Sequence, residues 1–156
     1  MKRLVLILAT FVFVFVFGGI QAQELPYEIK HYNLKNKLAV QGYDVVAYFS
    51  GEAIEGKKEL SHTVGEVIYH FSSKENLELF QANPTKYEPE YGGYCAYAMA
   101  DGDKVKIDPK TFKIIENKLF LFYNFRSTNT LELWNKQEQQ LLPKANKAWL
   151  DIIKEK

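Results

Sequence analysis

Cysteine is almost absent from this chain of 156 residues, in which Cys95 is the only one. A single cysteine cannot form a disulfide bond within the chain, so its thiol is a buried inert group, a metal ligand or a reactive group. A dominant charge is absent as well, because 20 basic residues stand against 19 acidic residues. Nucleic-acid-binding domains carry a strongly basic face, so this balance predicts no nucleic-acid partner.

The common catalytic signatures are missing too. The sequence contains no G-x-S-x-G, H-E-x-x-H, P-loop, C-x-x-C or G-x-G-x-x-G pattern. A pairing of Cys95 with a histidine is arithmetically possible, but nothing in the spacing supports it. The sequence therefore favours a binding protein over an enzyme.

Only one long apolar run is present, and it lies at the N-terminus. Lys2 and Arg3 precede an apolar stretch from residue 4 to 17, and Ile20-Gln21-Ala22 follows it. These three regions are typical of a secretory signal peptide over residues 1–22, cleaved before Gln23. An uncleaved membrane anchor is the alternative, but the run is shorter than the about 20 residues that a spanning helix needs. We expect an exported protein, periplasmic or secreted, with no membrane contact after cleavage.

The rest of the chain has the length of one domain. We expect residues 23–37 to form a loosely packed polar leader and residues 38–156 to form the domain. Residues 44–50 (DVVAYFS) read as a strand, and residues 64–71 as a second strand with a turn at Gly65. Ser73 is expected to cap a helix from residue 74 to 82, which Asn83-Pro84 stops.

The C-terminal part alternates in the same way between strands and helices. A hairpin is expected around Glu116-Asn117, with strands at residues 112–115 and 118–123. One helix is expected from residue 130 to 142, and Pro143 is expected to open a second one through residue 153. The predicted fold class is α+β: a small antiparallel sheet with a short helix after the second strand and two C-terminal helices.

Cys95 is the first candidate for chemistry. It follows Gly92-Gly93, which permit a sharp turn, and a helix beginning at Tyr94 would place the thiol near a helix N-terminus that favours thiolate. Met99 lies four residues later, on the same face of such a helix. Cysteine and methionine are soft ligands that suit Cu(I), whereas a buried thiol and a core methionine are the plain alternatives.

Histidines and tyrosines supply the other candidates. His70 lies in the middle of an expected strand and His62 lies beside a loop, so either one is a possible ligand or an ordinary packed or solvated side chain. Seven of the ten tyrosines fall between residues 43 and 97. Tyrosines line pockets as well as cores, so those of residues 87–97, Tyr94 and Tyr97 among them, are candidates to bind a small organic ligand.

Four runs of the sequence resemble the exported YHS-domain proteins. They are residues 42–49 (GYDVVAYF), 69–76 (YHFSSKEN), 80–87 and 91–97 (YGGYCAY), and the resemblance covers nearly the whole chain after the leader. Short metal-associated modules of the wider YHS group carry cysteines at positions that Ala47, Ser72 and Asn76 occupy here. The resemblance therefore does not bring that metal site to this chain. It aligns Cys95 with the selenium-containing residue of some relatives, which implies a redox or soft-metal centre there.

The leading functional prediction is an extracytoplasmic protein that binds a soft metal, most plausibly a copper ion. Cys95 is predicted to anchor the metal as a thiolate, with His70, Met99 and His62 as the further ligands. Two alternatives stay open. One is a thiol-based redox protein that uses Cys95; the other is a binding domain for a small organic ligand in a pocket lined by tyrosines.

Overall fold

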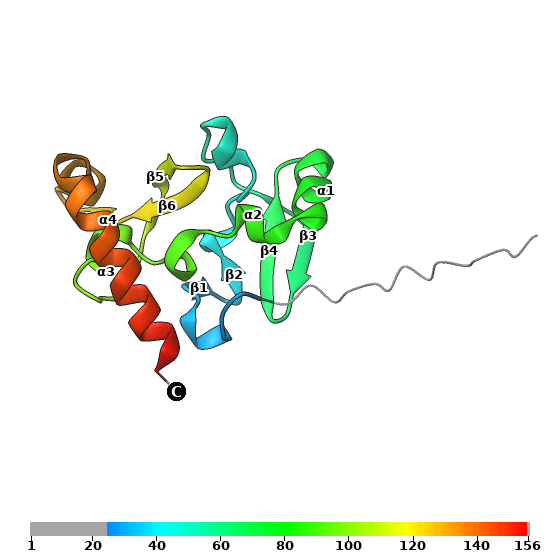
Figure 1. The fold of residues 1–156 in the computed structure, drawn as a ribbon. Helices are drawn as coiled ribbons and strands as arrows, with labels where there is room; N and C mark the ends of the chain where they lie inside the picture. The colour runs from blue at the N-terminus through cyan, green and yellow to red at the C-terminus, as the bar shows by residue number, and fades with distance from the viewer. Residues whose placement is uncertain (1–24, 156) are drawn as a thin grey trace, which may run out of the picture.

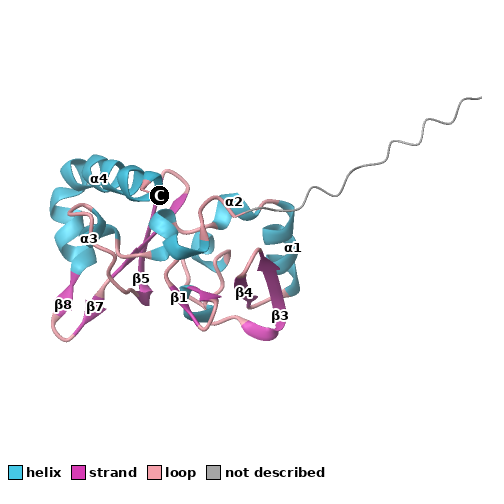
Figure 2. Ribbon diagram, turned by 90° about the horizontal axis from the view of Figure 1, so that it is seen from below, coloured by secondary structure: helices cyan, strands magenta, loops and turns pink. Residues whose placement is uncertain are grey.

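The structure is a computed structural model that describes residues 25–155 (Figure 1). The predicted signal peptide lies outside the described residues. Figures 1 and 2 show β3, β4 and α1 on one side of the molecule and α3, α4, β5 and β6 on the other, with β1 and β2 between them. Helices and strands are both well represented, so the predicted α+β class is confirmed.

The first sheet has four strands in the order β1-β2-β4-β3. Its strands are β1 (Leu34–Lys35), β2 (Leu38–Ala39), β3 (Lys57–Val64) and β4 (Val67–Phe71). The β1–β2 and β3–β4 pairs are antiparallel, but β2 pairs with β4 in parallel through Leu38 and Ile68. The sheet is therefore mixed and not purely antiparallel as predicted.

Strand β4 shows the alternation that the sequence predicts. Val67, Tyr69 and Phe71 are buried in the core, while Ile68 and His70 face the other side of the sheet. The polar stretch before it is also a strand: β3 pairs with β4 beyond the turn at Gly65 and Glu66. No strand was predicted for residues 57–63, because the mostly exposed side chains there carry no apolar pattern.

Two short helices follow β4. Helix α1 (Lys74–Ala82) begins where the sequence predicts, because the Ser73 hydroxyl oxygen accepts a hydrogen bond of 3.1 Å from the backbone N–H of Asn76. Asn83 ends α1 and caps α2 (Pro84–Tyr87). Further single turns are η1 (Ile29–His31), η2 (Val40–Gly42), η3 (Ala47–Ser50), η4 (Glu90–Gly93) and α3 (Ala96–Met99).

The strand predicted for residues 44–50 is wrong. The segment turns and continues as the 3-10 helix η3. The buried Asp44 carboxylate accepts hydrogen bonds from the backbone N–H groups of Val46 and Ala47, at 2.9 and 3.3 Å. A side chain that binds the backbone two and three residues ahead stabilises a turn at the expense of an extended strand.

The second half begins with the predicted hairpin. It joins β5 (Asp108–Ile115) to β6 (Lys118–Phe122), and the turn residues Glu116 and Asn117 both have positive φ, 49° and 61°. Positive φ at both central positions gives the turn a twist that matches the strands. A second ribbon, β7 (Asn124–Phe125) with β8 (Thr128–Asn129), leads into the last helix.

The C-terminal helices predicted on either side of Pro143 form one element, α4 (Thr130–Lys154). Its break lies at Gln137, where φ is −139° and ψ is 19°, and not at Pro143. The side chains on both sides of the break are held, since the Trp134 indole N–H and the Lys113 ammonium both donate to Glu138 Oε2, at 2.9 and 2.6 Å. The break is therefore fixed by tertiary contacts that the sequence pattern does not contain.

Strand β6 separates two apolar cores. Leu119 and Leu121 belong to the first core, with β4 and α1, whereas Phe120 and Phe122 belong to the second core, with α4. Both faces of β6 are buried, which explains its continuous apolar sequence. The loose packing predicted for residues 23–37 is wrong for the described part, since His31 and Tyr32 are 4% and 5% exposed and β1 belongs to the sheet.

No helix within residues 25–155 combines the length and the apolar character that crossing a membrane requires.

Candidate functional site

The unsatisfied buried polar atoms of the molecule gather in one region. Within residues 25–155, the buried side-chain atoms that lack a hydrogen-bond partner are His31 Nε2, Tyr32 OH, Glu88 Oε2 and Trp149 Nε1. The Trp149 ring lies 6.0 Å from that of His31, and the Tyr27 ring lies 5.1 Å from Trp149 and 5.9 Å from Tyr32. Buried polar atoms without partners are rare in folded proteins, so this region requires an explanation.

Glu88 is the charged member of this group. It is 9% exposed, its Oε1 accepts a hydrogen bond from the Tyr69 hydroxyl, and none of the ion pairs within the described residues involves it. Burial raises the pKa of Glu88 to about 7, and the bond from Tyr69 only partly opposes this rise. Near neutral pH this carboxyl therefore exists in both protonation states.

The tyrosines around Glu88 respond to its charge. Burial raises the pKa of Tyr69 and of Tyr32, and the nearby Glu88 carboxylate raises both further. Burial also raises the pKa of Tyr27, with the Glu90 and Glu88 charges adding to it and Trp149 and Lys118 opposing it. The Tyr27 hydroxyl lies beside the Trp149 indole without meeting hydrogen-bond geometry. Tyr27 therefore lies close enough to feel the charge of Glu88, and it also lines the cavity described next.

A cavity of about 380 Å³ opens beside Tyr27, and we call it the aromatic cavity. Three aromatic side chains from distant parts of the sequence contribute to its wall. The lining residues are Tyr27, Glu90, Tyr91, Lys118, Asn146, Trp149, Leu150 and Ile153. Ligand pockets have about this volume and combine apolar or aromatic walls with a few polar groups.

The turn at η4 positions Tyr91 in this wall. Tyr91, Gly92 and Gly93 all have positive φ, at 57°, 60° and 82°. A Cβ atom on Gly92 would lie 2.0 Å from the His31 carbonyl oxygen, so only glycine allows this approach of the N-terminal segment. Asn33 completes the contact, because its backbone N–H donates to the Gly92 carbonyl at 2.8 Å. The sharp turn predicted at the two glycines is present.

One side of the aromatic cavity is polar. The Lys118 ammonium lies 3.3 Å from Glu90 Oε1, and the side chains are 57% and 22% exposed. The Tyr91 hydroxyl donates to Asn146 Oδ1 at 2.8 Å, which fixes both side chains. A second cavity of about 380 Å³ shares Glu90 and Lys118 with the first and has Glu88 in its wall. The ion pair therefore stands between the two cavities.

Cys95 lies elsewhere and is fully buried in the first core. The backbone N–H of Tyr123 donates to its Sγ at 3.3 Å, and the Thr130 hydroxyl oxygen lies 3.4 Å from Sγ. The Thr130 hydroxyl donates its single hydrogen to the Tyr123 carbonyl at 2.9 Å. In the contact between Cys95 and Thr130, the thiol is therefore the donor and the hydroxyl oxygen the acceptor. Through these contacts the Cys95 side chain joins the end of β6 to the start of α4.

The other predicted metal ligands do not surround this sulfur. Met99 donates its backbone N–H to the Cys95 carbonyl at 3.0 Å, but its side chain is buried in the second core. His70 lies on the face of β4 that points away from the first core. On that face it packs on Gly42 and Gly56. His62 lies near α1, with its Nδ1 at 3.3 Å from Gln81 Nε2.

These positions give the predicted copper site no geometric support. Within residues 25–155 there is no group of three or more His, Cys, Asp or Glu side chains that could hold a metal ion. Soft-metal sites need ligands about 2.0 to 2.3 Å from the metal, and Cys95 is instead surrounded by hydrogen-bond partners and core side chains. The residues present do not fit a copper ion anchored at Cys95.

Tyr94 and Tyr97 do not line the aromatic cavity. The Tyr94 hydroxyl donates to the Tyr32 carbonyl at 3.3 Å, and the Tyr94 ring lies 5.5 Å from the Lys104 ammonium. Tyr97 packs between the two cores. Of the tyrosines expected to form a pocket, Tyr91 lines the cavity. Sequence reasoning missed Tyr27 and Trp149, whose positions far from residues 87–97 gave no local signal.

Ser72, Asn76 and the backbone of Ala47 meet at one carboxylate. Asp44 is fully buried, and its Oδ2 accepts hydrogen bonds from the Ser72 backbone, the Ser72 hydroxyl and the Asn76 amide at 2.8, 2.6 and 2.7 Å. Its Oδ1 accepts from the backbone of Val46 and Ala47. Five donors leave little room for a cation on this carboxylate, so the cluster stabilises the fold and is no binding site.

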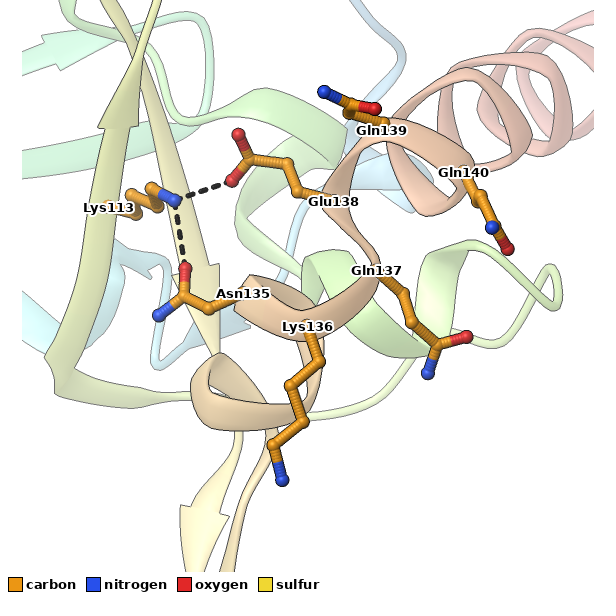
Figure 3. Close-up of a pocket in the computed structure, with 7 residues that line it drawn as sticks. All are labelled: Lys113, Asn135, Lys136, Gln137, Glu138, Gln139 and Gln140. Atoms are coloured by element: carbon orange, nitrogen blue, oxygen red, sulfur yellow. Dashed lines mark hydrogen bonds and ion pairs between the residues drawn. The ribbon is translucent and has the colours of Figure 1, made fainter.

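A polar cavity of about 330 Å³ lies at the break in α4, lined by Lys113, Asn135, Lys136, Gln137, Glu138, Gln139 and Gln140. Lys113 donates to Asn135 Oδ1 and Glu138 Oε2, at 2.8 and 2.6 Å (Figure 3). Figure 3 also shows that Lys136, Gln137 and Gln140 point away from this ion pair. The polar groups of this cavity do not point toward a common centre, so the aromatic cavity is the better candidate for a ligand site.

The chain was compared with protein families, with curated proteins and with solved structures. None of the three comparisons found a match.

Proposed function

We propose that this chain is a binding protein that takes up a small organic ligand with an apolar ring or chain in the aromatic cavity. The observation that carries the proposal is the wall of this cavity, where Tyr27, Tyr91 and Trp149 stand beside a few polar groups. Its volume of about 380 Å³ suits a ligand of modest size. A ligand-binding domain was already an alternative to a copper protein on the sequence alone, but with the tyrosines of residues 87–97 as its wall. Of the tyrosines in the wall of the aromatic cavity, Tyr91 belongs to that segment and Tyr27 does not.

The unsatisfied polar atoms support the same location. Of the four buried polar side-chain atoms without partners in residues 25–155, Trp149 Nε1 belongs to a residue of this cavity, and the His31 and Tyr32 rings pack on Trp149 and Tyr27. The fourth residue, Glu88, lines the neighbouring cavity. Each such atom calls for an explanation, and a polar partner brought by a ligand or by water is one explanation. Export of the chain and its resemblance to the YHS-domain proteins remain predictions that are compatible with a binding role.

The test is a titration of the purified protein with 2-phenylethanol, an uncharged compound with one aromatic ring. We expect a dissociation constant of about 1 mM, the scale of a small compound held mainly by apolar contact. Leu150→Glu places a charge at the cavity wall, and we expect it to weaken binding at least about tenfold. Isothermal titration calorimetry measures both proteins.

A matched control is Leu79→Glu. Leu79 is 44% exposed on α1 and Leu150 is 49% exposed on α4, so both variants change an exposed helical leucine to the same residue. Leu79 does not line the aromatic cavity. Equal binding by wild type and Leu79→Glu, with loss in Leu150→Glu, supports the proposal. Absence of binding by the wild type, or equal weakening in both variants, contradicts it.

A further inference from the structure

The ion pair of the aromatic cavity has a feature that the proposed function does not use. Lys118 and Glu90 put one ammonium and one carboxylate, 3.3 Å apart, into the wall of a cavity whose other members include Tyr27, Tyr91 and Trp149. The two charges cancel, so the cavity as a whole has no preference for a net anion or a net cation. It has a preference for a ligand with one charge of each sign.

The pair is also available to a ligand. Lys118 is 57% exposed and Glu90 is 22% exposed, and such a pair contributes little to stability because water competes for both charges. A ligand that offers each of them a new charged partner therefore loses little by separating them. Charge-assisted hydrogen bonds to the ligand replace the one that is opened.

Asn146 adds a donor on the same side. Its Oδ1 already accepts the hydrogen bond from the Tyr91 hydroxyl at 2.8 Å. The amide nitrogen of Asn146 is therefore the part of this side chain that remains for a ligand, and an amide N–H donates to a carboxylate. The polar side of the cavity thus offers two donors for an anion and one acceptor for a cation.

We propose, building on the function proposed above, that the ligand is a free α-amino acid with an apolar or aromatic side chain. Its ammonium binds Glu90, its carboxylate binds Lys118 and the Asn146 amide, and its side chain lies against Tyr27 and Trp149. An α-amino acid carries its ammonium and its carboxylate on the same carbon atom. The two charges are therefore close together, which matches two partners that lie 3.3 Å apart.

Four compounds that share a phenyl ring test this assignment. L-phenylalanine carries both charges, 2-phenylethylamine only the ammonium, 3-phenylpropionate only the carboxylate and 2-phenylethanol neither. We expect L-phenylalanine to bind the purified protein about tenfold more tightly than each of the other three, as measured by calorimetry. 2-Phenylethanol separates this inference from the proposed function, because it reports on the apolar wall alone.

Two charge-removing variants make the assignment specific. Glu90→Gln is expected to weaken L-phenylalanine about tenfold and to leave 3-phenylpropionate bound at least as tightly as before. Lys118→Gln is expected to weaken L-phenylalanine by a similar factor while 2-phenylethylamine binds at least as tightly. Glu116→Gln and Lys86→Gln remove the same charges from the neighbouring cavity and are expected to change nothing.

The outcomes are distinct. Tighter binding of L-phenylalanine, with opposite effects of the two variants on the singly charged compounds, supports the inference. Equal binding of all four compounds overturns it and leaves the proposed function intact. If the two variants weaken all four compounds alike, the pair has only a structural role and the inference is again overturned. If none of the four compounds binds, the proposed function itself fails.

Discussion

Asp44 and Glu88 are both buried carboxyl groups, but their surroundings differ in the number of hydrogen-bond donors. Asp44 accepts five hydrogen bonds from backbone and side-chain donors. Glu88 accepts one, from Tyr69, and its Oε2 has no partner among residues 25–155. Donors stabilise a buried carboxylate, and burial with a single donor raises the pKa of Glu88. The Asp44 arrangement stabilises the fold, whereas Glu88 lines the cavity next to the one in which we place the ligand.

The largest expected effect on stability comes from removing the Asp44 carboxylate. Asp44→Ala removes the acceptor of five hydrogen bonds and leaves the Val46 and Ser72 donors without it, and we expect the free energy of unfolding to fall by about 4 kcal/mol. Urea denaturation followed by circular dichroism measures this change.

Asp108→Ala is the matched control for that variant. Asp108 accepts two hydrogen bonds, from the Lys110 backbone and the Thr111 hydroxyl, and is only partly buried. We expect a loss of about 1 kcal/mol. A cost for Asp44→Ala no greater than that for Asp108→Ala would show that the Asp44 network does not stabilise the fold.

The second effect depends on pH and concerns Glu88. Because the folded pKa of about 7 lies above the ordinary value of 4.5, the folded chain holds this proton after the unfolded chain has released it. The Glu88 contribution to stability therefore falls as pH rises from about 4.5 to 7, by about 3 kcal/mol, and is constant above. Glu88→Gln keeps the shape of the neutral acid and is expected to remove this fall.

The measurement is urea unfolding of wild type and Glu88→Gln at pH 5 and pH 8. Relative to the wild type, the variant should gain about 3 kcal/mol of stability between the two values. Glu59→Gln, at an exposed position of β3, controls for the change in net charge. A difference between wild type and Glu88→Gln that does not change with pH would mean that Glu88 is ionised in the folded chain at both values.

A further prediction concerns Cys95, whose sulfur, like the Asp44 carboxylate, has hydrogen-bond partners inside the protein. The buried thiol should react with a thiol reagent at least about a thousandfold more slowly in the native protein than in guanidinium chloride, because reaction requires unfolding. Absorbance on release of thionitrobenzoate follows the reaction. Fast labelling of the native protein would support the redox alternative and contradict the role given to this thiol.

The same residue tests the copper prediction. Metal analysis of wild type and Cys95→Ser after copper loading and desalting compares the two proteins directly. The geometry leads us to expect the same low copper content in both, since Cys95 is enclosed by core residues and hydrogen bonds. About one equivalent of copper in the wild type and none in Cys95→Ser would establish the predicted thiolate site.

The sequence predicts those elements whose signals are local. The alternation of β4, the Ser73 cap of α1 and the hairpin around Glu116-Asn117 each depend on residues within a few positions, and all three are present. Residues 44–50 have the composition of a strand but form a turn, in which the Asp44 carboxylate accepts from Val46 and Ala47. Ser72 and Asn76, far away in the sequence, hold that carboxylate in place. Long-range partners decide such cases, and a single sequence does not contain them.

The candidate site follows the same rule. A tyrosine-lined pocket was expected from residues 87–97, and Tyr91 lines the aromatic cavity. Its other rings, Tyr27 and Trp149, come from a segment expected to be a loose leader and from the last helix. Glu88 gave no signal because its unusual pKa arises from burial, which depends on the whole fold. Residue type alone predicted a cavity with tyrosine in its wall but not which residues line it.

The most direct test of the ligand site uses the two tryptophans, of which Trp149 lines the aromatic cavity and Trp134 is buried in the second core. Their indole N–H signals in a nitrogen-resolved NMR spectrum, assigned with Trp149→Phe, are followed while 2-phenylethanol is added. The account predicts a saturable shift of the Trp149 signal and an unchanged Trp134 signal, which reports the bond to Glu138. An unchanged Trp149 signal, or equal shifts of both, would contradict it.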